Sequence, residues 1–115
     1  MDDPGTTLRH FTKPELANFL AAQAVASAQG FIDGRGDAAR LAQDATRIFS
    51  QLELVGADPR CHAIVDTTRL LLTAMTHAAV TSGPRAERWA EIMNAFVRLL
   101  RLESTELAAT GAQRQ

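Results

Sequence analysis

His62 and Asp66 stand four residues apart in a segment with helical periodicity, a spacing that places an imidazole and a carboxylate on one helix face. Two such groups can share a metal ion or a proton. A metal site needs more ligands, and the next histidine of the segment, His77, lies about 22 Å farther along the helix axis. We therefore expect a solvated His62–Asp66 pair, with Arg69 and His77 elsewhere on the same narrow polar strip, and no bound metal or cofactor. A metal or general-base role would need ligands from another helix.

The single cysteine, Cys61, directly precedes His62. Neighbouring residues of a helix point about 100° apart, so the thiol and the imidazole do not form a nucleophilic pair. Cys61 also begins the apolar side of its segment, which predicts a small buried hydrophobic residue rather than a reactive thiol. One cysteine excludes an intramolecular disulfide and favours a reducing compartment.

Gly34-Arg35-Gly36-Asp37 combines glycines, an arginine and a predicted helix start, which are the parts of many anion sites. The segment lacks the Lys-Ser/Thr ending of a phosphate-binding loop, and it follows a helix rather than a strand. The ability of Asp37 to cap the next helix accounts for the pattern. We do not expect an anion site here.

Charge is nearly balanced over the 115 residues, with 12 basic and 13 acidic side chains and a net charge of −1. This balance gives no general attraction to nucleic acid or to an anionic membrane. A nucleic-acid contact would therefore need a local patch, for which Arg88, Arg98 and Arg101 are the candidates. Glu87 and Glu91 lie close to them in the sequence and would repel phosphate.

Four helices are predicted to position these side chains. The first starts at Thr12, where Glu15 completes a capping box and Phe11 can touch Leu16, and it stops at Gly30. Asp37 caps the second helix, which closes at Gly56. Asp58-Pro59 starts the third, which extends to about residue 82, and Gly83-Pro84 starts the fourth, which extends to about residue 108. The 21 alanines and the scarcity of aromatic residues support an all-helical chain.

Apolar or small residues recur every three or four positions in the first two helices, so each helix buries one stripe. The residues predicted to be buried are Leu16, Phe19, Leu20, Ala24, Ala28 and Phe31 in the first helix, and Leu41, Ala45, Ile48, Phe49, Leu52 and Val55 in the second.

The third predicted helix has the widest apolar arc, made of Cys61, Ile64, Val65, Thr68, Leu71, Leu72, Met75 and Ala79 and widened by Ala63, Leu70 and Ala74. A surface helix needs an apolar stripe only somewhat wider than ~100°. This helix is therefore either the centre of the domain or also covered by another chain.

The fourth helix is predicted to bury Trp89, Ile92, Met93, Phe96, Leu99, Leu100 and Leu107. Glu103 interrupts this stripe. Because a carboxylate is rarely buried alone, either the helix projects beyond the domain at that point or Glu103 meets Arg69 or Arg101.

These elements predict an all-α, antiparallel four-helix bundle over residues 11–109, with a flexible leader at 1–10 and a frayed tail at 110–115. The third and fourth helices exceed the other two by roughly 10 Å, which leaves apolar surface unmatched. A homodimer through the longer helices would cover it, since a two-fold interface uses the same patch twice. The predicted interaction surface is Ala63, Leu70, Ala74 and Leu107.

The sequence pattern brings no set of polar side chains together at one point. We therefore expect a non-enzymatic protein that acts by protein–protein interaction as an adaptor, inhibitor or regulatory subunit. The alternative is a nucleic-acid-binding accessory protein that uses the arginine patch, and a weaker one is a small-ligand or metal binder in the bundle interior. The acidic N-terminus and the lack of a ~20-residue apolar run favour a cytoplasmic protein with no membrane partner.

Overall fold

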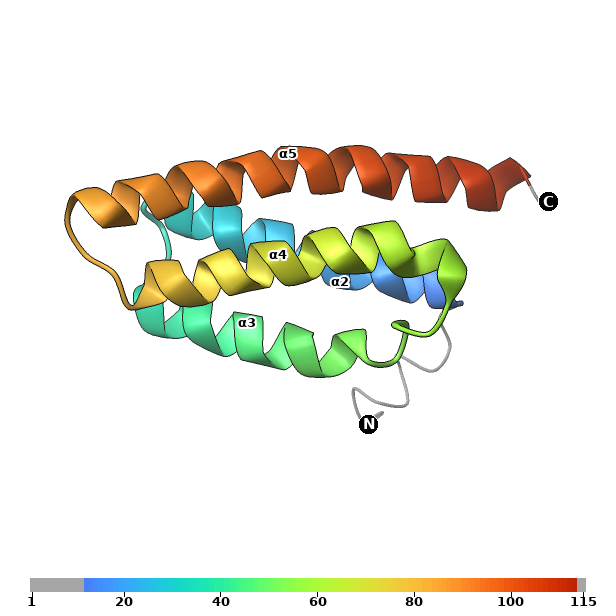
Figure 1. Ribbon diagram of the computed structural model, residues 1–115, viewed down its shortest axis with the longest axis horizontal. Coiled ribbons are helices and arrows are strands. Elements are labelled where there is room, and N and C mark those ends of the chain that lie inside the picture. Colours follow the sequence, from blue (N-terminus) through green and yellow to red (C-terminus); the bar gives the residue numbers. More distant parts are fainter. Residues whose placement is uncertain (1–11, 114–115) are drawn as a thin grey trace.

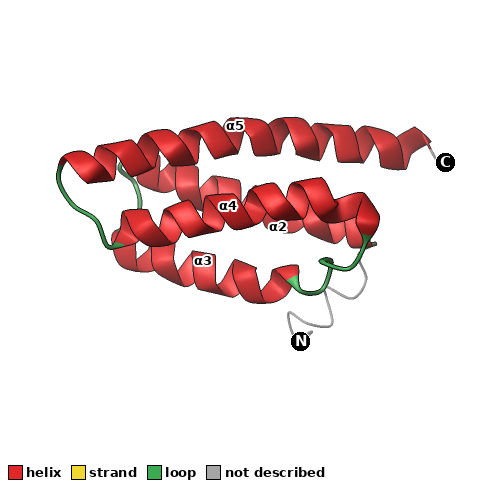
Figure 2. Cartoon of the chain, in the orientation of Figure 1, coloured by secondary structure: helices red, strands yellow, loops and turns green. Residues whose placement is uncertain are grey.

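The computed structural model describes residues 12–113, which form four helices and one short 3₁₀ turn with no strand in that range (Figure 2). The elements are α2 Lys13–Ile32, α3 Ala38–Leu52, η1 Pro59–Cys61, α4 His62–Ala79 and α5 Pro84–Gln113. The helices lie side by side, and short loops at their ends join them in chain order (Figure 1). The predicted all-α class is therefore confirmed.

The start of α2 is the predicted capping box. The Thr12 hydroxyl accepts a hydrogen bond from the Glu15 backbone N–H at 3.2 Å, and the Glu15 carboxylate accepts one from the Thr12 backbone N–H at 3.3 Å. The predicted contact of Phe11 with Leu16 lies outside the described residues. Asp37 caps α3 as predicted, since its carboxylate accepts from the Arg40 backbone N–H at 2.7 Å.

The predicted end of α2 at Gly30 is wrong, because the helix continues through that glycine to Ile32. The left-handed residue that ends a helix is Gly34, whose φ is 78°. The Arg35 N–H closes the turn by donating to the Gly30 carbonyl at 2.8 Å. The helix therefore ends before Gly34 rather than at Gly30.

The predicted third helix, 59–82, is too long at both ends. Asp58 caps the segment as expected, but the first turn is the 3₁₀ element η1, so α4 begins at His62. At the other end α4 stops at Ala79, where the Thr81 hydroxyl donates to the His77 carbonyl at 2.6 Å. With 18 residues, α4 is shorter than the 20-residue α2.

The other two boundaries also differ from the prediction. α3 ends at Leu52 rather than Gly56, because the chain turns there toward η1. α5 continues past residue 108 to Gln113 and has 30 residues. It is thus the one long helix of the described chain, and its last turns extend beyond the other helices (Figure 1).

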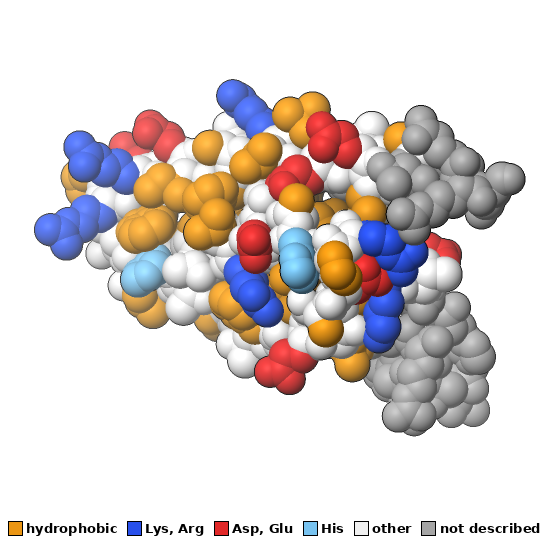
Figure 3. All heavy atoms as spheres, turned by 45° about the vertical axis from the view of Figure 1, so that its right-hand side comes forward, with side chains coloured by type: hydrophobic (Ala, Val, Ile, Leu, Met, Phe, Trp, Pro, Cys, Tyr) orange, Lys and Arg blue, Asp and Glu red, His pale blue; other side chains and the backbone are white. Residues whose placement is uncertain are grey.

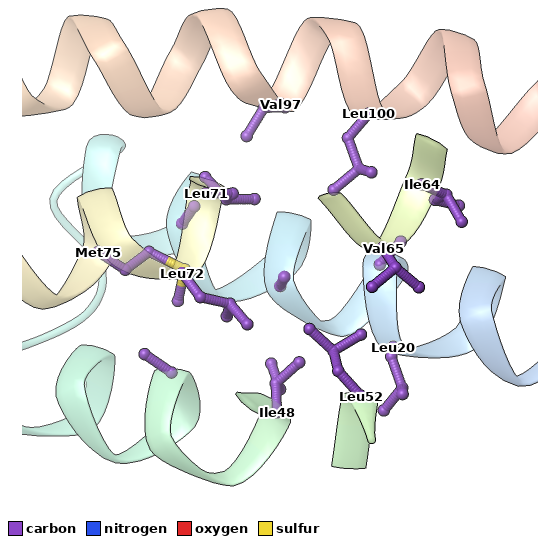
Figure 4. Packing of buried hydrophobic residues seen from close by; sticks show 14 of the residues in the cluster. Leu20, Ile48, Leu52, Ile64, Val65, Leu71, Leu72, Met75, Val97 and Leu100 are labelled. Atoms are coloured by element: carbon purple, nitrogen blue, oxygen red, sulfur yellow. The ribbon is translucent and has the colours of Figure 1, made fainter. Parts of the chain in front are cut away.

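The core lies between all four helices. Leu20 of α2, Ile48 of α3, Leu71 of α4 and Leu100 of α5 are fully buried and point toward one another, together with the neighbours drawn in Figure 4. The side of α2 that faces the core is mainly alanine, which allows the other helices to approach it closely. The buried alanines of α2 are Ala17, Ala21, Ala24 and Ala28.

Several residues predicted to be buried lie instead at the surface. Phe19, Phe49, Ile92 and Leu99 are each more than a third exposed. They stand at the flanks of their apolar stripes. Conversely Val97, which the prediction omitted, is fully buried in α5.

Candidate interaction surface

The contact between His77 and Trp89 shows which flanks of α4 and α5 face each other. Their rings are stacked, with centroids 4.7 Å apart and planes inclined by 8°. The two residues lie on either side of the loop at residues 80–83, near the end at which α4 and α5 are joined (Figure 1).

Away from this loop, the same two flanks carry apolar residues. Seven residues make nearly two helical turns, so Leu70 lies on the flank of α4 that His77 marks, and Phe96 on the flank of α5 that Trp89 marks. Phe96 is half-buried and packs against the core, whereas Leu70 is 51% exposed. One more step of seven residues on α4 reaches Ala63, which is also exposed.

The exposed apolar surface continues on the outward side of α5. Ile92, Leu99 and Leu102 are all exposed there, Leu102 by 64%. We refer to Ala63, Leu70, Ile92, Leu99 and Leu102 as the α4–α5 face. Figure 3 shows apolar side chains gathered where α5 lies along α4. Single exposed leucines are ordinary on protein surfaces, but a contiguous group of them is typical of an interaction site.

The four residues predicted from the sequence to form an interaction surface do not stay together. Ala63 and Leu70 are exposed on α4. Ala74 is 2% exposed, because the neighbouring helices of the same chain cover that part of α4, so it belongs to the core. Leu107 is half-buried and packs against the core. The sequence pattern missed Ile92, Leu99 and Leu102 as surface residues, since their spacing also fits a buried stripe.

The predicted polar site is spread along α4. His62 and Asp66 are both exposed, and among the described residues they share neither a hydrogen bond nor an ion pair. The Arg69 guanidinium lies beside the loop at Gly56, 3.5 Å from the position that a Cβ would take there. His77 is held against Trp89. No three metal-binding side chains come together within the described part of the chain.

Glu103 does not form the ion pair with Arg69 or Arg101 that the sequence left open. It is half-buried, and its Oε1 atom has no hydrogen-bond partner among the described residues. Nor does it lie beyond the domain, because Ser104 next to it donates to Asn18 of α2 at 2.7 Å. Both expectations for this residue are therefore wrong.

Cys61 is fully buried at the end of η1. Burial raises the pKa of its thiol, because a thiolate would be poorly solvated there. A thiol of this kind is a weak nucleophile. The prediction that Cys61 is a packed hydrophobic residue is confirmed.

The glycine-rich turn 34–37 forms one wall of a cleft of about 420 Å³ between α2 and α3. Arg35 and Arg47 both line this cleft, and both guanidinium groups already have partners within the chain. Arg35 pairs with Asp33 at 2.9 Å, and Arg47 donates to Gln23 at 2.8 Å. These contacts hold the two guanidinium groups against side chains of the same chain.

Arg88, Arg98 and Arg101 are all exposed on α5, but they do not form one patch. At 100° per residue they spread over about 140° of the helix circumference. Arg101 lines a groove of about 720 Å³ between α2 and α5, on the side of α5 away from the flank that faces α4. No single side of α5 therefore carries all three arginines.

The Asp58 carboxylate is the group with the clearest change in acidity. Its oxygens accept two hydrogen bonds from the Arg60 side chain, at 2.7 and 3.1 Å, and one from the Arg60 backbone N–H at 2.9 Å. These bonds, the side-chain ones first, lower the pKa of Asp58 from 3.8 to about 2. Because the folded pKa is the lower one, the pair stabilises the fold above pH 3.8, and this contribution is lost as the pH falls toward 2.

We predict that an NMR-monitored titration of the Asp58 carboxyl will have its midpoint near 2 and that Arg60→Ala will move the midpoint back toward 3.8. A wild-type midpoint close to 3.8 would show that the Asp58–Arg60 pair does not persist in solution.

Comparison with models of protein families, with curated proteins and with solved structures found no match to this chain. None of the described helices combines the length and the apolar character needed to cross a bilayer.

Proposed function

We propose that this is a non-enzymatic protein that acts by binding another protein, a second copy of itself included, through the α4–α5 face. In this proposal the four helices form an antiparallel bundle, and the bundle serves to present that face. One observation carries the proposal, namely that Leu70, Ile92, Leu99 and Leu102 are all exposed on adjoining sides of two neighbouring helices. Exposing such an apolar group to water is unfavourable, so association with a partner that covers the group is favoured.

The polar side chains support a binding role over a catalytic one. His62 and Asp66 share no hydrogen bond or ion pair among the described residues, His77 is stacked on Trp89, and Cys61 is buried. General acid–base chemistry needs two such groups within reach of one substrate atom. The exposed side chains that do gather on one surface are the apolar residues of the α4–α5 face.

A second copy of the chain is the simplest partner for this face. A two-fold interface is self-complementary, so one patch supplies both sides of it. A stable interface covers about 800 Å² on each partner. The α4–α5 face extends over two helices, of which α5 alone is about 45 Å long by helical rise, and this length is adequate for such an area.

We predict that the wild-type protein will have twice the 12.4 kDa chain mass by light scattering and that Leu99→Asp will shift it to the mass of one chain. A charge at position 99 would have to be buried against the partner, whereas in the separate chain it stays in water. Leu99 is 44% exposed, so the variant is expected to fold normally.

Leu54→Asp is the matched control, because Leu54 is 47% exposed but lies in the loop after α3. It should retain the wild-type mass. If the wild-type protein stays at the mass of one chain up to about 1 mM, self-association is excluded, since a specific dimer is usually tighter than that. If Leu54→Asp dissociates the dimer as fully as Leu99→Asp, another face is responsible.

A further inference from the structure

The outward side of α5 carries an exposed stripe with alternating spacings of four and three residues. The stripe consists of Arg88, Ile92, Ala95, Leu99, Leu102 and Glu106, all of them exposed. This spacing is that of the two contact positions in a coiled-coil heptad. The core side of α5 uses a different row that includes Met93, Val97 and Leu100. The helix thus has two contact rows, and its own chain covers only one of them.

The stripe has the same residue spacing on both sides of its midpoint, which lies between Ala95 and Leu99. A basic residue, Arg88, stands at one end and an acidic residue, Glu106, at the other, and the four positions between them are apolar. Suppose that two such helices pack antiparallel, with a two-fold axis through the midpoint of the stripe. Each stripe residue of one copy then faces the residue of the second copy that lies equally far from the midpoint on its opposite side. Arg88 then faces Glu106 of the second copy at both ends of the contact.

We propose that two copies of the chain associate by packing their α5 stripes antiparallel about a two-fold axis that crosses the stripe midway between Ala95 and Leu99. The inference rests on the proposed self-association and adds to it the register and the direction of the contact. In this register Ile92 faces Leu102, and the small Ala95 faces the larger Leu99. A small residue opposite a large one lets the two helices approach closely at the centre of the contact.

The end charges favour the antiparallel direction over the parallel one. In a parallel pair Arg88 would face Arg88 and Glu106 would face Glu106, which is repulsive at both ends. In the antiparallel pair both ends carry opposite charges. An exposed ion pair contributes little by itself, so the charges select direction and register while the apolar positions supply affinity.

The neighbouring flank of α4 extends the same contact. The stripe covers about 27 Å of helix between Arg88 and Glu106. Ile92 and Leu99 lie on the side of the stripe nearer to α4, where Leu70 is exposed. A second α5 lying on the stripe would also approach Leu70, which enlarges the apolar area beyond that of a two-helix contact.

Charge exchange between two variants tests this register. Arg88→Glu and Glu106→Arg each replace both attractive end pairs of the dimer with repulsive ones. In a mixed dimer of the two variants, the introduced glutamate at position 88 faces the introduced arginine at position 106. The native Arg88 faces the native Glu106 at the other end, so both end pairs are attractive again. The measurement is native mass spectrometry and sedimentation equilibrium at low ionic strength, where screening is weakest.

We expect each single variant to dimerise about tenfold more weakly than the wild type, and we expect their equimolar mixture to form the mixed dimer preferentially. The double variant Arg88→Glu/Glu106→Arg should regain wild-type affinity. Arg101→Glu, which changes an exposed arginine on another side of α5, should leave the affinity unchanged. Circular dichroism of each variant checks that α5 stays folded.

Three results would overturn this inference while leaving self-association intact. They are single variants that dimerise as tightly as the wild type, a mixture that shows no preference for the mixed dimer, and a preference for pairing Arg88→Glu with the wild type, which is the signature of a parallel contact. A wild-type protein that remains a monomer under the same conditions would overturn both this register and the proposed self-association.

Discussion

Leu71→Asp is expected to remove most of the stability of the fold. Leu71 is completely buried at the centre of α4, among side chains from the other helices (Figure 4). An aspartate there would be an unpaired buried charge or would have to take up a proton, and either costs several kcal/mol. A domain of this size has a total stability of about 5–15 kcal/mol, so the change removes most of it. Circular dichroism and a thermal melt measure the loss.

Leu70→Asp is the matched control for this experiment. Leu70 is the preceding residue of the same helix and is exposed, so the aspartate would stay in water and the melting temperature of the single chain should change little. Because Leu70 belongs to the α4–α5 face, the same variant should associate more weakly. If Leu71→Asp melts like the wild type, the orientation of α4 in the core is wrong.

Ile48→Ala should destabilise the fold by about 2–5 kcal/mol. Ile48 is fully buried in α3, and removing its outer carbons leaves a cavity that the packed helices cannot close. Urea unfolding should show a lower midpoint with an unchanged slope, because the same surface is exposed on unfolding.

Phe49→Ala, one residue away, should cost clearly less, although phenylalanine loses more carbon atoms than isoleucine. Phe49 is 37% exposed, so part of its ring is already in water. The apolar pattern alone predicts both residues to be buried, so this comparison separates the structure from the pattern. A larger loss for Phe49→Ala than for Ile48→Ala would mean that α3 is rotated from its observed orientation.

The two apolar rows of α5 explain why the sequence pattern was ambiguous there. Met93 and Leu100 belong to the core row, and Ile92 and Leu99, each one residue earlier, belong to the exposed stripe. Adjacent residues of a helix differ by about 100°, so a single broad stripe can include both rows. The position of α4 beside α5 decides where burial ends, and the sequence of α5 contains no information on that position.

Helix starts could be read from the sequence alone. Thr12, Asp37 and Asp58 each cap the helical turn that follows them, as predicted, because a cap depends on a side chain and a backbone N–H within three residues. The all-helical class followed in the same way from local propensity and periodicity. These properties need no contact with distant parts of the chain.

Tertiary structure alone decided that Ala74 is covered while Leu70 is exposed, and that Leu100 is buried while Leu99 is not. Each depends on how far and in which direction a neighbouring helix reaches. Those distances are set by side chains far apart in sequence, such as the alanines of α2 and the stacked pair His77 and Trp89. Periodicity within one helix defines its apolar side, but only the packed neighbours determine how much of that side is removed from water.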